Sequence, residues 1–160
     1  MEAAPRVQRY LGRRAGFEIA EELTAEVFAL AWAARDRYDP AVGDAVGWLF
    51  GFVINVARRQ ARTGGRRQRA YGRLSADQAS VDHAEAVAGR LDNAQRLERT
   101  AAALDHLSRM DRDVILLRAW GELSYEQIGD ALGLDTTVVK TRLSRARRRL
   151  AAQMDEGGDP

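Results

Sequence analysis

Two separate runs of arginine and lysine are the residues of this chain whose chemistry is easiest to identify, and that chemistry is the binding of a polyanion. One run lies between positions 58 and 73 and the other between 140 and 149, and neither contains an acidic residue. The formal net charge is only +2, so the basic residues are concentrated in two places. Two basic surfaces indicate a polyanion such as a nucleic acid, contacted twice. For either run alone, a solvated helix face is the alternative.

The residue types needed for most catalytic or metal sites are scarce. The chain has no cysteine and only two histidines, His83 and His106. Disulfides, thiolate nucleophiles and zinc sites of the usual kind are therefore not expected. The acidic residues are numerous but show no spacing typical of a paired-carboxylate or Ser/His/Asp site. We therefore expect no enzyme, no cofactor and no metal.

Length and hydropathy bound the architecture. The 160 residues, of which 46% are hydrophobic, are enough for one ordinary domain or two small ones. No stretch approaches the ~20 uninterrupted apolar residues of a membrane span, and the first residues do not resemble an export signal. We expect a cytoplasmic protein without membrane insertion.

Helical spacing dominates the sequence, which predicts an all-α fold. The first strong helix is expected over 17–38, before Asp39-Pro40, and its apolar stripe comprises Ile19, Leu23, Val27 and Leu30. A second helix is expected from Trp48 into the first basic run, with a break at residues 63–65. Three aromatic residues lie among apolar neighbours and are predicted to be core residues: Phe28, Trp32 and Phe52.

Composition divides the chain into two small helical domains. Residues 72–93 are polar and contain no aromatic side chain, which is typical of a flexible linker. We therefore predict an N-terminal domain over 1–71, a C-terminal domain over 94–154 and a disordered tail over 155–160. Asp111 is expected to cap the helix that carries Val114 and Leu117.

A helix-turn-helix is predicted near the C-terminus. Ser124 and Gln127 have the spacing of a capping box, Gly133 permits a sharp turn, and Asp135 can cap a second helix. The apolar stripe of that second helix is Val139, Leu143, Ala146 and Leu150. Its opposite side is hydrogen-bonding and positive, which suits the major groove of DNA. The candidate DNA-contacting residues are Thr136, Thr137, Lys140, Thr141, Ser144, Arg145 and Arg148.

This C-terminal stretch resembles region four of the extracytoplasmic-function (ECF) sigma factors. The resemblance covers Leu123 to Ile128 and Val139 to Arg147, and it extends upstream to Arg112 to Arg118. It implies a domain that reads the minus-thirty-five promoter element. The chain departs from the family pattern at Thr137-Val138, where a Gly-Thr pair is common.

The N-terminal half resembles region two of the same family. Residues 20–32 are similar to the helix that binds the clamp coiled coil of the largest polymerase subunit, which implies a polymerase contact by Glu22, Leu23 and Glu26. Residues 48–59 are similar to the segment that reads and melts the minus-ten element, although Ile54 stands where a basic residue is usual. The loop 39–47 lies where the family captures a flipped base.

Aromatic and guanidinium groups near this second segment suit single-stranded DNA, because bases stack on aromatic faces and phosphates need positive charge. The candidate residues are Trp48, Phe50, Asn55, Arg58, Arg59 and Arg62. The resemblance therefore implies a sigma factor whose partners are core RNA polymerase and promoter DNA, both duplex and single-stranded. An anti-sigma factor that holds the protein inactive is a further expected partner.

A second hypothesis is a dimeric helix-turn-helix regulator that acts without replacing a sigma factor. In that case the N-terminal helices would serve for dimerisation. Such a regulator binds duplex DNA as a symmetric dimer without polymerase, whereas a sigma factor needs the core enzyme.

Overall fold

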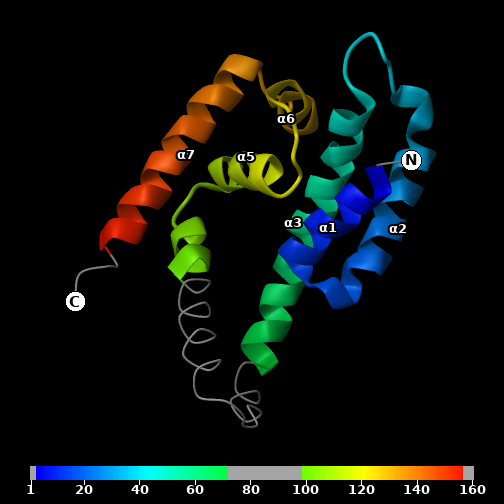
Figure 1. Ribbon diagram of the computed structural model, residues 1–160. Helices are drawn as coiled ribbons and strands as arrows, with labels where there is room; N and C mark the ends of the chain where they lie inside the picture. Colours follow the sequence, from blue (N-terminus) through cyan, green and yellow to red (C-terminus); the bar gives the residue numbers. More distant parts are fainter. Residues whose placement is uncertain (1–2, 72–98, 157–160) are drawn as a thin grey trace.

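All regular secondary structure that the computed structural model describes, over residues 3–71 and 99–156, is helical. The N-terminal half contains α1 (Ala3–Ala15), α2 (Phe17–Ala33), the short 3-10 helix η1 (Arg35–Arg37) and α3 (Ala45–Tyr71). The C-terminal half contains a helical segment over 99–105, α5 (Arg109–Ala119), α6 (Tyr125–Leu132) and α7 (Thr136–Glu156) (Figure 1). The predicted all-α fold is confirmed for these residues. The predicted linker 72–93 and His83 lie outside them.

A tight turn joins α1 to α2 and needs glycine at two positions. Gly16 has a φ of 105°, a conformation that residues with a Cβ atom rarely adopt. A Cβ atom on Gly12 would lie 2.4 Å from the ring of Phe17. The two glycines therefore let α2 fold back on α1, whose buried residues Val7, Tyr10 and Leu11 have the spacing of one helix face.

The buried stripe of α2 differs in part from the prediction. Leu23 and Val27 are buried as predicted, but the stripe continues to Ala31, and Leu30 is 40% exposed. Phe28 and Trp32, predicted as core residues, are 37% and 71% exposed. The apolar stretch contains more large side chains than one helix face can bury, so the aromatic residues four positions apart lie on the solvent side.

Helix α3 begins earlier and ends later than predicted. It begins at Ala45 because the Asp44 carboxylate accepts hydrogen bonds from the backbone N–H groups of Val46, at 2.9 Å, and Gly47, at 3.2 Å. The predicted break at residues 63–65 is wrong, because α3 continues to Tyr71. Glycine lowers helix stability by about 1 kcal/mol per residue without preventing the helix.

The helix-turn-helix forms as its sequence predicts. The Ser124 and Gln127 side chains each bond the other residue's backbone N–H, Gly133 adopts the left-handed conformation with φ 66°, and Asp135 accepts from the Thr137 N–H at 2.7 Å. The predicted cap of α5 is wrong, however. Ser108 caps α5 by accepting from the Asp111 N–H at 3.2 Å, and Asp111 lies in the first turn with a buried side chain.

One continuous hydrophobic core includes residues from both halves. Phe50 of α3 is fully buried, and a Cβ atom on Gly121, which follows α5, would lie 3.2 Å from its ring. In Figure 1, α6 lies beside the N-terminal end of α3. The two halves therefore pack directly against each other. No helix in the described ranges is long and apolar enough to cross a membrane.

Candidate nucleic-acid interface

The outer side of α7 presents polar and basic side chains on one face of the helix. Val139, Leu143 and Ala146 are buried against the rest of the C-terminal half, which fixes the orientation of α7. Among the predicted contacts, Thr136 is half-buried, and five residues are exposed: Thr137, Lys140, Thr141, Ser144 and Arg148. Four of these, at positions 137, 141, 144 and 148, repeat with helical spacing and so form a line along the face opposite the core. The arrangement is that of a recognition helix.

Arg145 differs from the other predicted contacts because it is paired within the domain. Its Nη2 atom lies 3.0 Å from Oδ1 of Asp111, and Arg142 Nη1 lies 2.8 Å from the same oxygen. The Arg145 side chain keeps 42% of its surface exposed, whereas that of Asp111 keeps 1%. Arg145 therefore holds α7 on α5 and has only part of its guanidinium available for DNA.

The pKa of Asp111 reflects this pairing. Burial raises the pKa of the carboxyl group, but the hydrogen bonds from Arg145, Arg142 and Ser108 together outweigh burial and hold it below its ordinary value. Asp111 is therefore charged at neutral pH. At the start of α7, the backbone N–H of Thr137 likewise lowers the pKa of the exposed Asp135.

The predicted single-stranded DNA contacts are only partly accessible. Asn55 and Arg62 are exposed on α3, and Trp48 is half-buried between Tyr38 and Phe52, with ring centroids 5.2 and 5.0 Å away. Phe50 is fully buried beneath them and makes an edge contact with Tyr10, so the prediction that it contacts DNA is wrong.

Two of the predicted arginine contacts are engaged in ion pairs. Arg58 donates two hydrogen bonds to Asp113 of α5, and Arg59 is paired with Glu26 of α2. Because each pair satisfies part of the guanidinium group, neither arginine is as free as Arg62.

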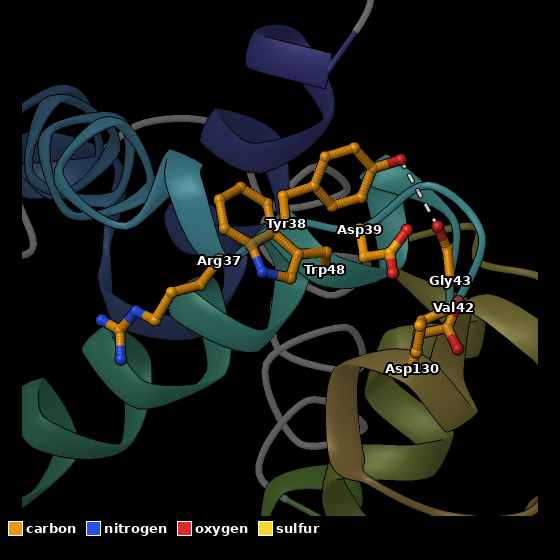
Figure 2. A pocket seen from close by; sticks show the side chains of 7 residues that line it. All are labelled: Arg37, Tyr38, Asp39, Val42, Gly43, Trp48 and Asp130. Atoms are coloured by element: carbon orange, nitrogen blue, oxygen red, sulfur yellow. Dashed lines mark hydrogen bonds between the residues drawn. The ribbon is translucent and has the colours of Figure 1, made fainter.

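A cavity of about 210 Å³ lies beside Trp48. It is lined by Arg37, Tyr38, Asp39, Val42, Gly43, Trp48 and Asp130. Figure 2 shows the Tyr38 and Trp48 rings close to each other, with Arg37 directed away from them. Six of the lining residues belong to the N-terminal half, but Asp130 comes from α6. The C-terminal half therefore forms one wall of this cavity.

The exposed side of α2 is a surface that the sequence prediction identified only in part. Glu22 is exposed, whereas Leu23 is 6% exposed and packs in the core, so the prediction that Leu23 contacts polymerase directly is wrong. Phe28 and Trp32 extend this surface, and the Arg35 guanidinium lies 4.8 Å from the Trp32 ring centroid. Phe28 and Trp32 each come one position after a residue of the buried stripe, which continues from Val27 to Ala31. This offset of one position was the signal in the sequence that the two aromatic side chains face outward.

Comparison with known families decides what this arrangement is. Residues 1–67 match Sigma-70 region 2, and residues 97–150 match Sigma-70 region 4. The ECF RNA polymerase sigma factor SigK of Mycolicibacterium vanbaalenii is 32% identical over 138 residues, which cover 82% of this chain. The chain belongs to the ECF sigma factors of the sigma-70 family. The matched part is 66% of that SigK, and 75% of the SigK of Mycobacterium ulcerans, which is 29% identical.

Solved structures show the same fold in other sigma factors. CnrH, solved in complex with the cytosolic domain of CnrY, is 26% identical with a TM-score of 0.61, over 97% of this ECF sigma factor and 82% of CnrH. The sigma factor RpoE of Bartonella quintana, solved with the anti-sigma factor NepR, has a TM-score of 0.59 at 24% identity, over 96% and 92% of the two chains.

The Asp111 pairing predicts an acid-sensitive C-terminal half. Because the folded-state pKa lies below the unfolded value of about 3.9, the charged carboxylate stabilises the fold above that value, and this contribution is lost as pH falls through the folded pKa. Asp111→Asn should lower the free energy of unfolding by about 2 kcal/mol at pH 7 and by less at pH 3. Chemical denaturation followed by circular dichroism measures both. The exposed Asp105→Asn is the control, and an equal loss at both pH values would contradict the assignment.

Proposed function

We propose that this chain is a sigma factor that binds core RNA polymerase and directs it to promoters by contacting two DNA elements. The observation that carries the proposal is the helix-turn-helix, in which α7 is held by its apolar stripe while Thr137, Thr141 and Arg148 line the exposed side. Membership of the ECF sigma factors supports the same function. The face of α7 would read the minus-thirty-five element in duplex DNA. The chain would itself catalyse no reaction and would act in the cytoplasm, where the polymerase is.

The N-terminal half would contact the minus-ten element once the strands separate. Trp48 offers part of its ring beside the cavity, and Asn55 and Arg62 add a hydrogen-bonding group and a charge on the same helix. A base removed from the stack costs a few kcal/mol, which a cavity next to an aromatic ring can offset. Arg58 and Arg59 would contribute to phosphate binding only after their ion pairs rearrange.

The exposed side of α2 would bind the clamp of the core enzyme. Glu22 supplies an exposed charge, and Phe28 and Trp32 supply apolar area. Leu23 packs in the core and so holds α2 in its orientation. Aromatic side chains of this kind often form the centre of protein interfaces. We also propose an anti-sigma factor as a partner, because the RpoE of Bartonella quintana was solved with one.

Transcription with purified core polymerase tests this function. The full chain should produce new start sites on a genomic fragment library only when core polymerase is present, and it should be captured by immobilised core. A symmetric dimer that binds duplex DNA without polymerase would instead indicate the regulator hypothesis.

Reversal of one charge on α2 tests the polymerase surface. Glu22→Lys should weaken binding to core polymerase about three- to tenfold. The substitution places a positive charge where the proposed interface pairs a negative one with a basic partner surface. Its circular-dichroism spectrum and thermal midpoint should stay near those of the wild type, since Glu22 is exposed. Asp105→Lys, an equal charge change in the C-terminal half, is the control. Wild-type affinity of Glu22→Lys would reject this surface.

Substitutions on α7 test the recognition helix within holoenzyme. Arg148→Ala should lower promoter affinity for all sequences alike and reduce the salt dependence by about one unit of slope, as expected for a phosphate contact. Thr137→Val should instead change the preference among sequences. Arg149→Ala, also exposed on the same helix, serves as the control because helical spacing places it off the line of Thr137, Thr141 and Arg148. Footprints identical to the wild type for both variants would show that α7 does not read the promoter.

Substitutions on α3 test strand opening. Holoenzyme with Asn55→Ala and Arg62→Ala should be recruited normally through α7 but should melt the minus-ten element poorly, as followed by permanganate reactivity of unpaired thymines. A template that is already mismatched there should restore most of the signal, because its melting cost has been removed. The paired substitution Gln8→Ala and Arg13→Ala on α1 is the control. Normal melting by the folded α3 variant would disprove the assignment.

A further inference from the structure

An exposed valine interrupts the polar side of α7. Val138, in the first turn of the helix, keeps 40% of its surface exposed, whereas the next residue, Val139, is fully buried in the core. The exposed residues around it, Thr137, Lys140 and Thr141, all carry groups that form hydrogen bonds. Val139 makes the core contact of this turn, so packing within the domain does not require an apolar side chain at position 138.

This valine lines a hollow of about 220 Å³ on the surface of α7. The hollow is formed by Thr137, Val138, Thr141, Arg142 and Arg145. Positions 141, 142 and 145 come three, four and seven residues after Val138, so these side chains lie along one face of the helix. Two guanidinium groups therefore flank an apolar side chain, an arrangement that suits an anionic partner which also presents an apolar group.

The polar groups around the hollow are held by partners within the protein. Thr141 donates its hydroxyl hydrogen to the Thr137 carbonyl oxygen at 3.0 Å. Arg142 and Arg145 both donate to Oδ1 of the buried Asp111, at 2.8 and 3.0 Å. The valine is itself stiff, because a β-branched side chain in a helix has one strongly preferred rotamer. Its methyl groups are therefore positioned before a partner binds, which lowers the entropy cost of binding.

The major groove of DNA offers one prominent apolar group, the C5 methyl of thymine. Residues in the N-terminal turns of a recognition helix contact the base edges, and Val138 is one of them. Cytosine and adenine present amino groups at the same edge. Against a valine these groups would lose water without gaining a hydrogen bond, so the side chain both favours thymine and disfavours its competitors.

We propose that Val138 is a specificity-determining residue, which packs against the C5 methyl group of a thymine in the minus-thirty-five element. This inference rests on the proposed function and adds to it the base that one side chain selects. Val138 stands where the Gly-Thr pair common in the family has its threonine, so a methyl group replaces a hydroxyl group at this position. The preference for thymine is therefore a property of this chain. Burial of one methyl group changes affinity about fourfold.

Removal of single methyl groups from the DNA tests this contact. Start sites mapped with wild-type holoenzyme give a promoter, from which a set of duplexes is made with one thymidine of the upstream element, on either strand, replaced by deoxyuridine. Deoxyuridine lacks the C5 methyl group but keeps every hydrogen-bonding group of thymidine. At one position the replacement should lower the affinity of wild-type holoenzyme about three- to fivefold.

Truncation of the valine completes a double-mutant cycle. Holoenzyme with Val138→Ala should bind the unmodified promoter about three- to fivefold more weakly and should no longer distinguish thymidine from deoxyuridine at that position, because both changes delete the same contact. Met154→Ala removes another exposed apolar side chain near the far end of α7 and should keep the wild-type sensitivity. Circular dichroism checks that both variants are folded.

The outcomes separate the inference from the proposed function. Wild-type holoenzyme that initiates at the mapped sites but tolerates every replacement would overturn the inference and leave the proposed function intact. A folded Val138→Ala chain that keeps the wild-type sensitivity to deoxyuridine would also overturn it, because another residue would then contact the methyl group. Absence of core-dependent initiation by the wild type would reject the proposed function, and the inference with it.

Discussion

The carboxylate of Asp113 has no exposed surface, and a buried charge of this kind is stable only with charged partners that supply hydrogen bonds. Arg14 and Arg58 are those partners, so α5 is bound to α1 and α3. Asp111, two positions earlier, is equally buried and is paired with Arg142 and Arg145 of α7. Residues two apart on a helix point in different directions. One short helix therefore uses two carboxylates to hold the recognition helix on one side and the N-terminal bundle on the other.

This double anchoring links the two basic surfaces of the chain. Arg145 and Arg58 belong to different surfaces, yet each gives part of its hydrogen-bonding capacity to a carboxylate of α5. The pairing within the C-terminal half fixes the orientation of α7, so that Thr137, Thr141 and Arg148 stay exposed. The pairing between the halves engages the Arg58 guanidinium of α3.

Much of the fold could be predicted from the sequence because it depends on local chemistry. The Ser124/Gln127 capping box, the left-handed Gly133 and the apolar stripe of α7 each act over a few residues, and all appear as expected. The errors arose where tertiary contacts decide. Asp111 looked like a helix cap, but arginines thirty-one and thirty-four positions away draw its side chain into the interior, and Ser108 takes the cap. Phe50 looked like a base-stacking residue, but the packing of α3 against α1 and α6 buries it. The Gly47 contact with α6 required knowledge of how the halves pack, which no local pattern provides.

The distance between spin labels at Gln8→Cys and Ala152→Cys, two exposed positions in different halves, tests the central claim most directly when it is measured with and without Asp113→Asn. The account predicts a short and narrow distribution for the free chain, consistent with halves joined through Asp113. It predicts a longer or broader distribution for Asp113→Asn, because the substitution removes the charge that binds Arg14 and Arg58. A folded Asp113→Asn chain that keeps the short and narrow distribution would contradict the account.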